Sequence, residues 1–259
     1  DILTFKYRDD GIINLDIENS NLSNGADNLI VKAAKFLKTS SGRDDLGVNI
    51  LLKKNIPIGA GLAGGSTDAA ATLYGLNILW GLGYTSENLE YISSKIGSDI
   101  PFCIEGGTQL CFGRGEILEQ AELPNMSLGV LLLKDPLISV STPWAYDLNK
   151  KHNQSNYLTT EQAYEVQRGH LRSAEWLKKS NANLIPPLNN DLEKVVAPIT
   201  PSVRKALELL RSIPENLSVA MSGSGPSCFA LFKDFNTADK ALERNYNLIK
   251  SAGFEAWSC

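Results

Sequence analysis

The sequence predicts an α+β protein built from two lobes, and three observations support this class. A strand-like stretch, Val48 to Leu52, leads through a glycine-rich loop, Pro57 to Ala70, into a long apolar helix that ends near Trp80. The last part of the chain has the order strand, strand, helix, strand, which is typical of an α+β sandwich with antiparallel pairing. Between these parts, from Thr142 to Arg211, the pattern changes to short helices separated by Asn, Ser and Pro.

The first elements are predicted from alternation and turn residues. Ile2 to Tyr7 and Ile12 to Ile17 alternate apolar and polar residues around Arg8-Asp-Asp-Gly11, so we expect a β-hairpin. A helix should follow from Asn28 to Lys38, with Asp27 as its cap. Its apolar residues recur at helical spacing, which predicts one buried face.

The middle of the chain alternates helix and strand signals. Thr85 or Ser86 should cap a helix over Glu87 to Ile96. Gln109 to Phe112 and Glu116 to Leu118 should form strands around the turn Gly113-Arg-Gly115. Leu128 to Lys134 has the apolar character of a buried strand.

The second lobe should begin near residue 140, which divides the chain into lobes 1–140 and 141–259. Thr142 followed by Pro143 is a helix-start pattern. Polar residues from Lys150 to Asn156 predict a loop. The remaining predicted elements are helices over Asp191 to Val196, Pro201 to Arg211 and Thr237 to Ser251, and strands over Leu217 to Met221, Cys228 to Phe232 and Glu255 to Ser258.

Composition excludes several classes of protein. The net charge of −4 argues against a nucleic-acid binder, which needs a basic surface. No apolar run reaches the length that spans a membrane. The four cysteines form no C-x-x-C pair, so we expect reduced residues of a cytoplasmic bacterial protein, with all but Cys259 in apolar surroundings. With only two histidines, a multi-histidine metal site is excluded.

The glycine-rich loop between a strand and a helix is a physical design for binding phosphate. Glycine allows close approach of the backbone to a ligand, and the N–H groups of a helix start attract anions. A tight turn capped by Ser66 or Thr67 is the alternative. The spacing excludes a Walker loop. Gly59-Ala-Gly61-Leu-Ala-Gly64 fits a dinucleotide signature, but the acidic residue expected about twenty positions later is missing.

The loop closely resembles the phosphate loop of the GHMP kinases, which act on galactose, homoserine, mevalonate and phosphomevalonate. Four other segments narrow the resemblance to one branch of that family, and the chain as a whole looks most like cyanobacterial members of this branch. The segments are Asp27-Asn-Leu-Ile30, Gly97-Ser-Asp-Ile-Pro-Phe102, Gly113-Arg-Gly-Glu116 and Ser222-Gly-Ser-Gly-Pro226. That branch phosphorylates the 2-hydroxyl of a cytidine-diphosphate-linked methylerythritol in the non-mevalonate isoprenoid route. The resemblance implies a ribosomal-protein-S5-like first lobe and a ferredoxin-like second lobe.

The resemblance also implies an ATP site. Asn28 would lie near the adenine and Lys54 along the nucleotide, whereas the alternatives without a ligand are a helix cap and a solvated charge. Gly223 and Gly225, with Ser224 between them, would supply further phosphate contacts. Mg²⁺ would be held by the phosphates and by Ser66 or Thr67. The loop residues expected to bind ATP are Pro57, Ile58, Gly59, Ala60, Gly61, Leu62, Ala63, Gly64, Gly65, Ser66 and Thr67.

Asp99 follows a predicted helix and precedes a predicted strand, where an acid is often only a local turn residue. By resemblance it is the catalytic aspartate, which would accept or orient the proton of the substrate hydroxyl. Its family partner is a lysine in an opening segment, Pro-Ala-Lys-Ile-Asn, that accompanies an aromatic-histidine pair. These residues are not among the 259. We therefore expect a chain truncated at both ends, with little activity as it stands.

Thr142 and Tyr146 would contact the substrate by resemblance, the ring of Tyr146 lying against cytosine. A capped helix with a core tyrosine is the alternative. Arg114 is given a turn role, with a substrate-phosphate contact as a further option. We expect a monomer or weak homodimer with a small-molecule substrate. The competing functions are a GHMP kinase for another alcohol, such as homoserine or mevalonate, a nucleotide-binding protein without catalysis, and a dinucleotide oxidoreductase.

Overall fold

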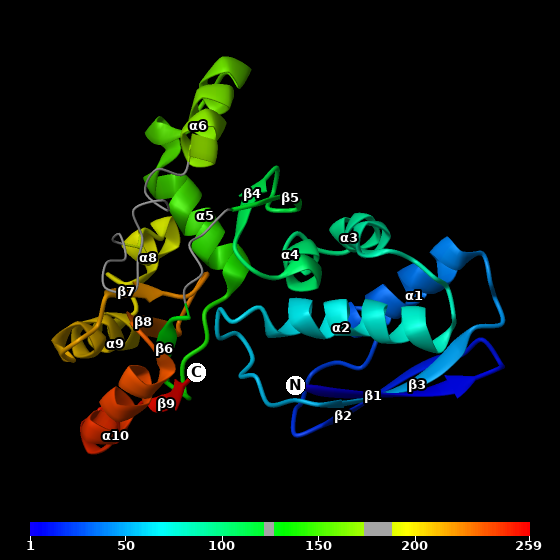
Figure 1. Cartoon of the computed structure of the whole chain (residues 1–259), viewed down its shortest axis with the longest axis horizontal. Coiled ribbons are helices and arrows are strands. Elements are labelled where there is room, and N and C mark those ends of the chain that lie inside the picture. Colours follow the sequence, from blue (N-terminus) through cyan, green and yellow to red (C-terminus); the bar gives the residue numbers. More distant parts are fainter. Residues whose placement is uncertain (122–126, 174–187) are drawn as a thin grey trace. The chain divides into compact units, whose positions relative to one another are not determined.

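The computed structural model describes residues 1–121, 127–173 and 188–259, and Figure 1 shows its elements along the chain. These residues form two compact units. The first contains Asp1–Ile56 and Ala63–Gln120, and the second contains Pro57–Leu62 and Ala121–Cys259. Six residues of the glycine loop thus belong to the second unit although both flanks belong to the first. The predicted lobes, 1–140 and 141–259, have a different boundary from these units, and the division into those lobes stays a prediction.

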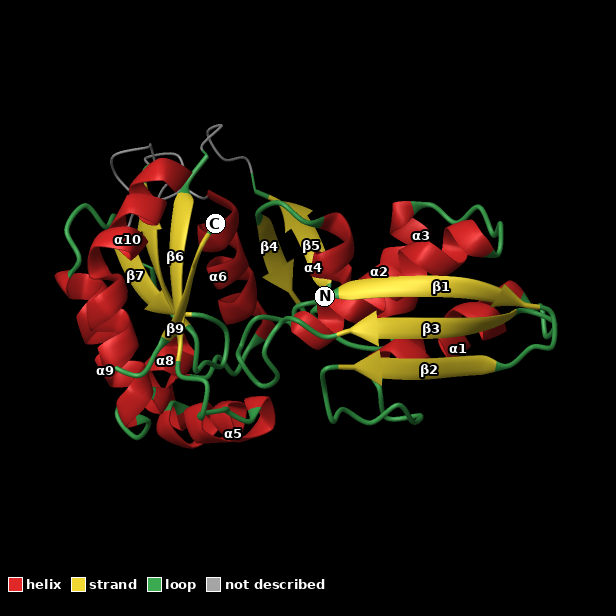
Figure 2. Ribbon diagram, turned by 90° about the horizontal axis from the view of Figure 1, so that it is seen from below, coloured by secondary structure: helices red, strands yellow, loops and turns green. Residues whose placement is uncertain are grey.

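The sheet of the first unit has the order β1-β3-β2, with β1 at Ile2–Arg8, β2 at Ile13–Glu18 and β3 at Gly47–Lys53. β3 is antiparallel to β1 and parallel to β2. The predicted hairpin of β1 and β2 is therefore wrong, since β3 lies between them (Figure 2).

A glycine explains how the short connection from β1 to β2 crosses the start of β3. A β-carbon at Gly47 would lie 2.9 Å from both the nitrogen and the oxygen of Ile12. The Val48 N–H donates to the Ile12 carbonyl, which holds the crossing in place. The turn residues were identified correctly, but turn chemistry cannot show that a later strand separates the two arms.

Helices α1 (Leu29–Ser41) and α2 (Gly64–Leu79) cover one face of this sheet (Figure 2). The first unit also contains α3 (Ser86–Ser94), α4 (Ile100–Glu105) and a two-stranded sheet of β4 (Gln109–Phe112) and β5 (Ile117–Gln120). Thr85 caps α3 through a capping box, as one of the two predicted alternatives required. The core lies between the three-stranded sheet and the helices, where the side chains of Val48, Ile50 and Leu52 are buried.

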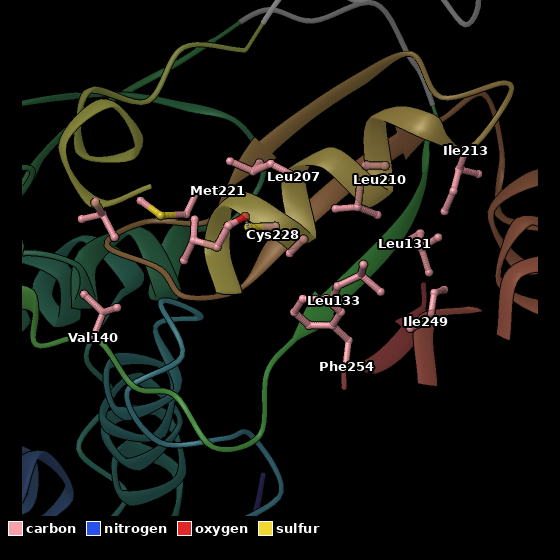
Figure 3. Close-up of a cluster of buried hydrophobic side chains, with 14 of the residues drawn as sticks. Leu131, Leu133, Val140, Leu207, Leu210, Ile213, Met221, Cys228, Ile249 and Phe254 are labelled. Atoms are coloured by element: carbon pink, nitrogen blue, oxygen red, sulfur yellow. Dashed lines mark hydrogen bonds between the residues drawn. The ribbon is translucent and has the colours of Figure 1, made fainter. Parts of the chain in front are cut away.

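The second unit contains a four-stranded antiparallel sheet in the order β7-β8-β6-β9, which confirms the predicted antiparallel pairing. Its helices α9 and α10 pack against the strands. Figure 3 shows apolar side chains of the resulting core. The strands are β6 (Gly129–Lys134), β7 (Ser218–Met221), β8 (Cys228–Phe232) and β9 (Glu255–Ser258), and the helices are α5 (Thr142–His152), α6 (Glu161–Ser173), α8 (Asp191–Val196), α9 (Pro201–Ser212) and α10 (Phe235–Ser251).

Three local predictions need correction. Residues 150–156, predicted as a loop, contain the end of α5 and a short 3₁₀ helix, Gln154–Asn156. Asp99 precedes a short helix rather than a strand. Cys111 is exposed instead of buried, because its position on the short β4–β5 sheet faces solvent. No helix in the described ranges combines the length and apolarity needed to span a membrane.

Candidate functional site

In the second unit, residues 57–62 of the glycine loop lie against the segment 222–226, which we call the third glycine motif. The Ser222 hydroxyl donates to the Gly61 carbonyl at 2.8 Å, and the Ser227 N–H donates to the Ala60 carbonyl at 3.2 Å. Gly61 has φ +72°, and a β-carbon there would collide with the Ser222 carbonyl oxygen. The two backbones therefore approach more closely than any residue other than glycine would allow.

Some N–H groups of the third glycine motif form hydrogen bonds within the motif's own turn. The Gly225 N–H donates to the Ser222 carbonyl at 2.8 Å, so it is not free to bind phosphate as expected from the sequence. Ser224 is buried, and its hydroxyl lies 3.0 Å from the Thr142 hydroxyl. A sequence motif identifies the glycines that permit a turn. It does not show which of their N–H groups form hydrogen bonds within that turn.

The back half of the loop, in the first unit, leads into α2 at Gly64. Ala63 adopts a left-handed conformation with φ +51°, and the helix start has neither a side-chain cap nor an acidic residue in its first turn. The N–H groups of this turn and the partial positive charge of the helix are thus left for an anion. Phosphate fits this arrangement because no carboxylate caps the helix start. A capping carboxylate would occupy the same N–H groups and repel the phosphate.

The two hydroxyls at this helix start differ in how they are used. The Thr67 hydroxyl donates to the Ala63 carbonyl at 3.1 Å and can accept from the Cys103 thiol, which leaves one lone pair of its oxygen for a cation. The Ser66 hydroxyl makes no hydrogen bond within the part of the chain that the structure describes. Both oxygens therefore have lone pairs for a hard cation such as Mg²⁺.

Asp99 is exposed at the start of α4, and its side chain does not cap that helix. Loss of solvation and, to a lesser extent, the Asp99 charge raise the pKa of two cysteine thiols, Cys103 and Cys111. Burial raises the pKa of Cys103, and the Asp99 carboxylate raises it further, while a contact with Thr67 opposes the shift. The Cys103 sulfur lies 3.6 Å from the Thr67 hydroxyl. α4 therefore places the candidate catalytic carboxylate and the start of α2 within one neighbourhood of the first unit.

Cys103 was not among the residues predicted for the site. It lies four residues after Asp99, one helical turn along, and that spacing is the signal that could have found it once α4 was expected to be a helix. The pKa of Cys111, although the residue is exposed, is also raised, first by partial loss of solvation beside neighbouring protein atoms and then by the Asp99 charge. Both thiols are therefore kept protonated at neutral pH.

Asn28, predicted to lie near the adenine, and Lys54, predicted to lie along the nucleotide, already have internal partners. Asn28 caps α1 by accepting from the Ile30 N–H, and its amide nitrogen donates to the Ser23 carbonyl. Asp27, the predicted cap, instead accepts from the Ser23 hydroxyl, because Asn28 has the extended backbone that a cap requires. The Lys54 ammonium is buried between two carboxylates rather than solvated.

The residues predicted for the substrate and turn lie as follows. Tyr146 is 60% exposed on α5, while Thr142 is the first residue of α5 and Ser141 precedes it as the cap position. Arg114 lies in the β4–β5 turn, where its N–H donates to the Glu116 carboxylate at 2.6 Å. Its side chain is 73% exposed, and its guanidinium lies 3.5 Å from the Glu116 carboxylate and 3.5 Å from the Ser94 carbonyl, so the backbone and the side chain both have partners near this turn.

Comparison with known proteins identifies the family. The model of the GHMP kinase N-terminal domain matches residues 28–107, and that of the C-terminal domain matches residues 165–248. A 4-diphosphocytidyl-2-C-methyl-D-erythritol kinase of Prochlorococcus marinus is 54% identical over all 259 residues, which cover 81% of that protein. The chain belongs to the GHMP kinase family.

Two further comparisons support this assignment. A kinase of the same name from Synechococcus sp. (strain CC9902) is also 54% identical to this GHMP kinase over all 259 residues, which cover 84% of that relative. A crystal structure of 4-(cytidine 5'-diphospho)-2C-methyl-D-erythritol kinase has a TM-score of 0.70 and 26% identity, covering 99% of this chain and 84% of the other. The protein is a small-molecule kinase, and GHMP kinases use ATP as the phosphate donor.

Proposed function

We propose that this GHMP kinase transfers the γ-phosphoryl group of ATP to the 2-hydroxyl of 4-diphosphocytidyl-2-C-methyl-D-erythritol, a step of isoprenoid precursor synthesis. The observation that carries the proposal is the 54% identity, over all 259 residues, to relatives of that name. The proposed setting is the bacterial cytoplasm, with a monomer or weak homodimer as the active form.

The proposed phosphate site uses backbone N–H groups. Those of the first turn of α2 would bind the phosphate oxygens, helped by the partial charge of the helix. In the second unit, taken by itself, the N–H groups of Gly223 and Ser224 are proposed as phosphate donors, because the Gly225 N–H is used within its own turn. Preorganised donors of this kind stabilise charge that develops in the transition state.

Mg²⁺ is proposed to bind with ATP, held by the Ser66 or Thr67 oxygen in addition to the phosphates. When bound, the cation neutralises phosphate charge during transfer. The oxygen of Thr67 suits this role because its single proton is already donated to the Ala63 carbonyl. Asn28 remains a proposed neighbour of the adenine and Lys54 a proposed neighbour of the nucleotide, although the Asn28 amide and the Lys54 ammonium already have partners inside the protein.

Asp99 is the proposed base that accepts or orients the proton of the attacking hydroxyl. Its carboxylate is exposed and is not used as a helix cap, so it is free to accept a hydrogen bond from a substrate. Thr142 and Tyr146 are proposed contacts for the cytidine end. Because the Thr142 hydroxyl contacts Ser224, a substrate bound there would be coupled to the third glycine motif.

Replacing Asp99 with Asn tests the chemical role. Asn keeps the size of the side chain but cannot accept a proton, so kcat should fall by roughly 10² to 10⁴-fold while the thermal stability stays unchanged. The measurement is ADP release by the complete protein with 4-diphosphocytidyl-2-C-methyl-D-erythritol and ATP. Asp16→Asn, which alters an exposed carboxylate on β2, is the matched control. Retention of full kcat by Asp99→Asn would remove Asp99 from catalysis.

A panel of acceptors tests the proposed substrate. The unaltered protein should phosphorylate the cytidine-linked acceptor with a kcat/KM far above that for homoserine, mevalonate or galactose. Preference for one of these alcohols would overturn the substrate assignment and leave the family assignment intact. Binding of ATP without transfer to any acceptor would favour the non-catalytic alternative.

A further inference from the structure

A buried ionic cluster lies beside the glycine loop in the first unit. The Lys54 ammonium is 2.6 Å from an Asp1 carboxylate oxygen and 2.7 Å from an Asp68 carboxylate oxygen. The side chains of Lys54, Asp1 and Asp68 are 6%, 3% and 4% exposed. We call these three residues the Lys54 cluster. Buried charges are costly to desolvate even when they are paired, so the cluster is weak evidence for stability and calls for another role.

The cluster joins the two ends of the loop. The second carboxylate oxygen of Asp1 accepts from the N–H groups of Asn55 and Ile56, each at 2.7 Å. Asp68 lies in the second turn of α2. The first unit ends at Ile56 and resumes at Ala63, and the six residues between belong to the second unit. The cluster therefore closes the base of the loop within the first unit.

The ammonium also lies against the start of the helix. A β-carbon at Gly64 would be 3.1 Å from the Lys54 nitrogen and 2.9 Å from a methyl group of Ile56. A cation beside a helix N-terminus is repelled by the partial positive charge of the helix. The Asp1 and Asp68 carboxylates offset that repulsion and hold the ammonium in position.

Asp68 is the more sensitive member of the cluster. Its second carboxylate oxygen is buried and has no hydrogen-bond partner among the described residues, so Lys54 is the only cation that the described part of the chain places on this carboxylate. By contrast, Asp1 has two additional N–H partners. Loss of the Asp68 charge should therefore release the helix from Lys54 while Asp1 still holds the strand end.

We propose that Asp68 is a positioning residue for ATP, acting through Lys54 to fix the first turn of α2 relative to the end of β3. The proposal rests on the proposed function, because it takes that helix start as the phosphate site. It also gives Lys54 a different primary task from a direct nucleotide contact. Its positive charge is used inside the protein, and its effect on ATP is transmitted by the helix start.

The test is Asp68→Asn, which preserves the size of the side chain and removes the charge. We expect the Kd for ATP, measured by calorimetry without acceptor, to rise about tenfold or more, since small displacements of binding groups are costly. The KM for the acceptor should change less than about twofold at saturating ATP. A higher Kd for ATP with a nearly unchanged KM for the acceptor would show that the substitution affects the ATP site in particular. A general loss of structure would weaken the binding of both substrates.

Two controls make the result decisive. Leu37→Ala truncates a buried residue of α1 and should lower the melting temperature without changing the Kd for ATP. Asp16→Asn removes an exposed charge and should change neither quantity. An unchanged ATP Kd in Asp68→Asn would overturn the proposal, as would a Kd change no larger than that of a comparably destabilised Leu37→Ala.

A second variant covers the case in which Asp68→Asn does not fold. Asp1→Asn keeps a group that can accept from the Asn55 and Ile56 N–H groups and removes the other charge, so it should weaken ATP binding in the same direction. An unchanged ATP Kd there would contradict the proposal. Because ATP binding is measured without acceptor, preference for another alcohol would refute the proposed function without affecting this inference.

Discussion

At the scale of single residues, two side chains that the motifs connect with a ligand already bond to groups within the protein. Asn28 uses its amide oxygen as a helix cap and its amide nitrogen on the Ser23 carbonyl. Lys54 is neutralised by carboxylates that lie 53 and 14 residues away in the sequence. Residue type and motif position predicted where these side chains are, but not which atoms remain free, because that depends on partners from other elements.

A pair of carboxyl groups in the first unit gives a pH-dependent prediction. The pKa of Glu90 is raised by partial burial, by a hydrogen bond with Glu105 and by the charges of Glu105 and Glu87. A raised carboxyl pKa means that the folded state favours the protonated form. The charged form therefore lowers stability at pH values above the raised pKa, and this penalty disappears as the pH falls.

Glu90→Gln should consequently stabilise the protein near pH 8, by less than about 1 kcal/mol because the site is partly solvated. The gain should shrink as the pH decreases and vanish below the ordinary value of 4.5. Thermal unfolding across this range measures it, with the exposed Glu208→Gln as the control. A gain that is the same at every pH would show that the carboxyl charge is not its cause.

At the scale of elements, the glycine loop is divided between the two units. Residues 57–62 are held by the third glycine motif in the second unit, and the helix start from Gly64 belongs to the first. The sequence predicted strand, loop and helix in the right order. It could not show that the loop leaves one unit and returns, since every residue of the motif is equally compatible with a loop that stays within one fold.

Gly61→Ala tests the close approach of the two glycine motifs. The added methyl group would collide with the Ser222 carbonyl and lie 2.8 Å from the Gly225 nitrogen, at a φ of +72°. We expect a loss of about 1–3 kcal/mol of stability and a fall in ATP affinity of about 10² or more.

Gly83→Ala is the matched control for this change. Gly83 has φ +70°, but a β-carbon there meets nothing within 4 Å. It therefore reproduces the backbone strain without the collision, and it should leave ATP affinity unchanged. Equal effects of the two substitutions on ATP binding, measured by calorimetry, would exclude the contact with the third motif as the reason for glycine at position 61.

At the scale of the whole molecule, each unit has its own apolar core. Phe232 is fully buried in the core of the second unit, and Leu73 is fully buried in that of the first. Truncating either side chain to alanine leaves a cavity that the surroundings only partly fill, so each substitution should cost about 3–5 kcal/mol.

Hydrogen exchange can locate these losses. Phe232→Ala should lower amide protection mainly in β6, β8 and α10, whereas Leu73→Ala should lower it mainly in α2 and β3. Both variants are compared with the unaltered protein under the same conditions. Equal loss of protection throughout both units from either substitution would contradict independent cores.

The sequence by itself determined the fold class, most strands and helices, the family and the candidate residues of the site, because these depend on periodicity and on local motifs. Tertiary structure decided that β3 separates β1 from β2 and that the Gly225 N–H is consumed by its own turn. It also decided that Asp68, Lys54 and Asp1 share one buried cluster. The reason is physical: pairing, burial and hydrogen-bond partners are set by segments distant in the chain, and no local pattern records them.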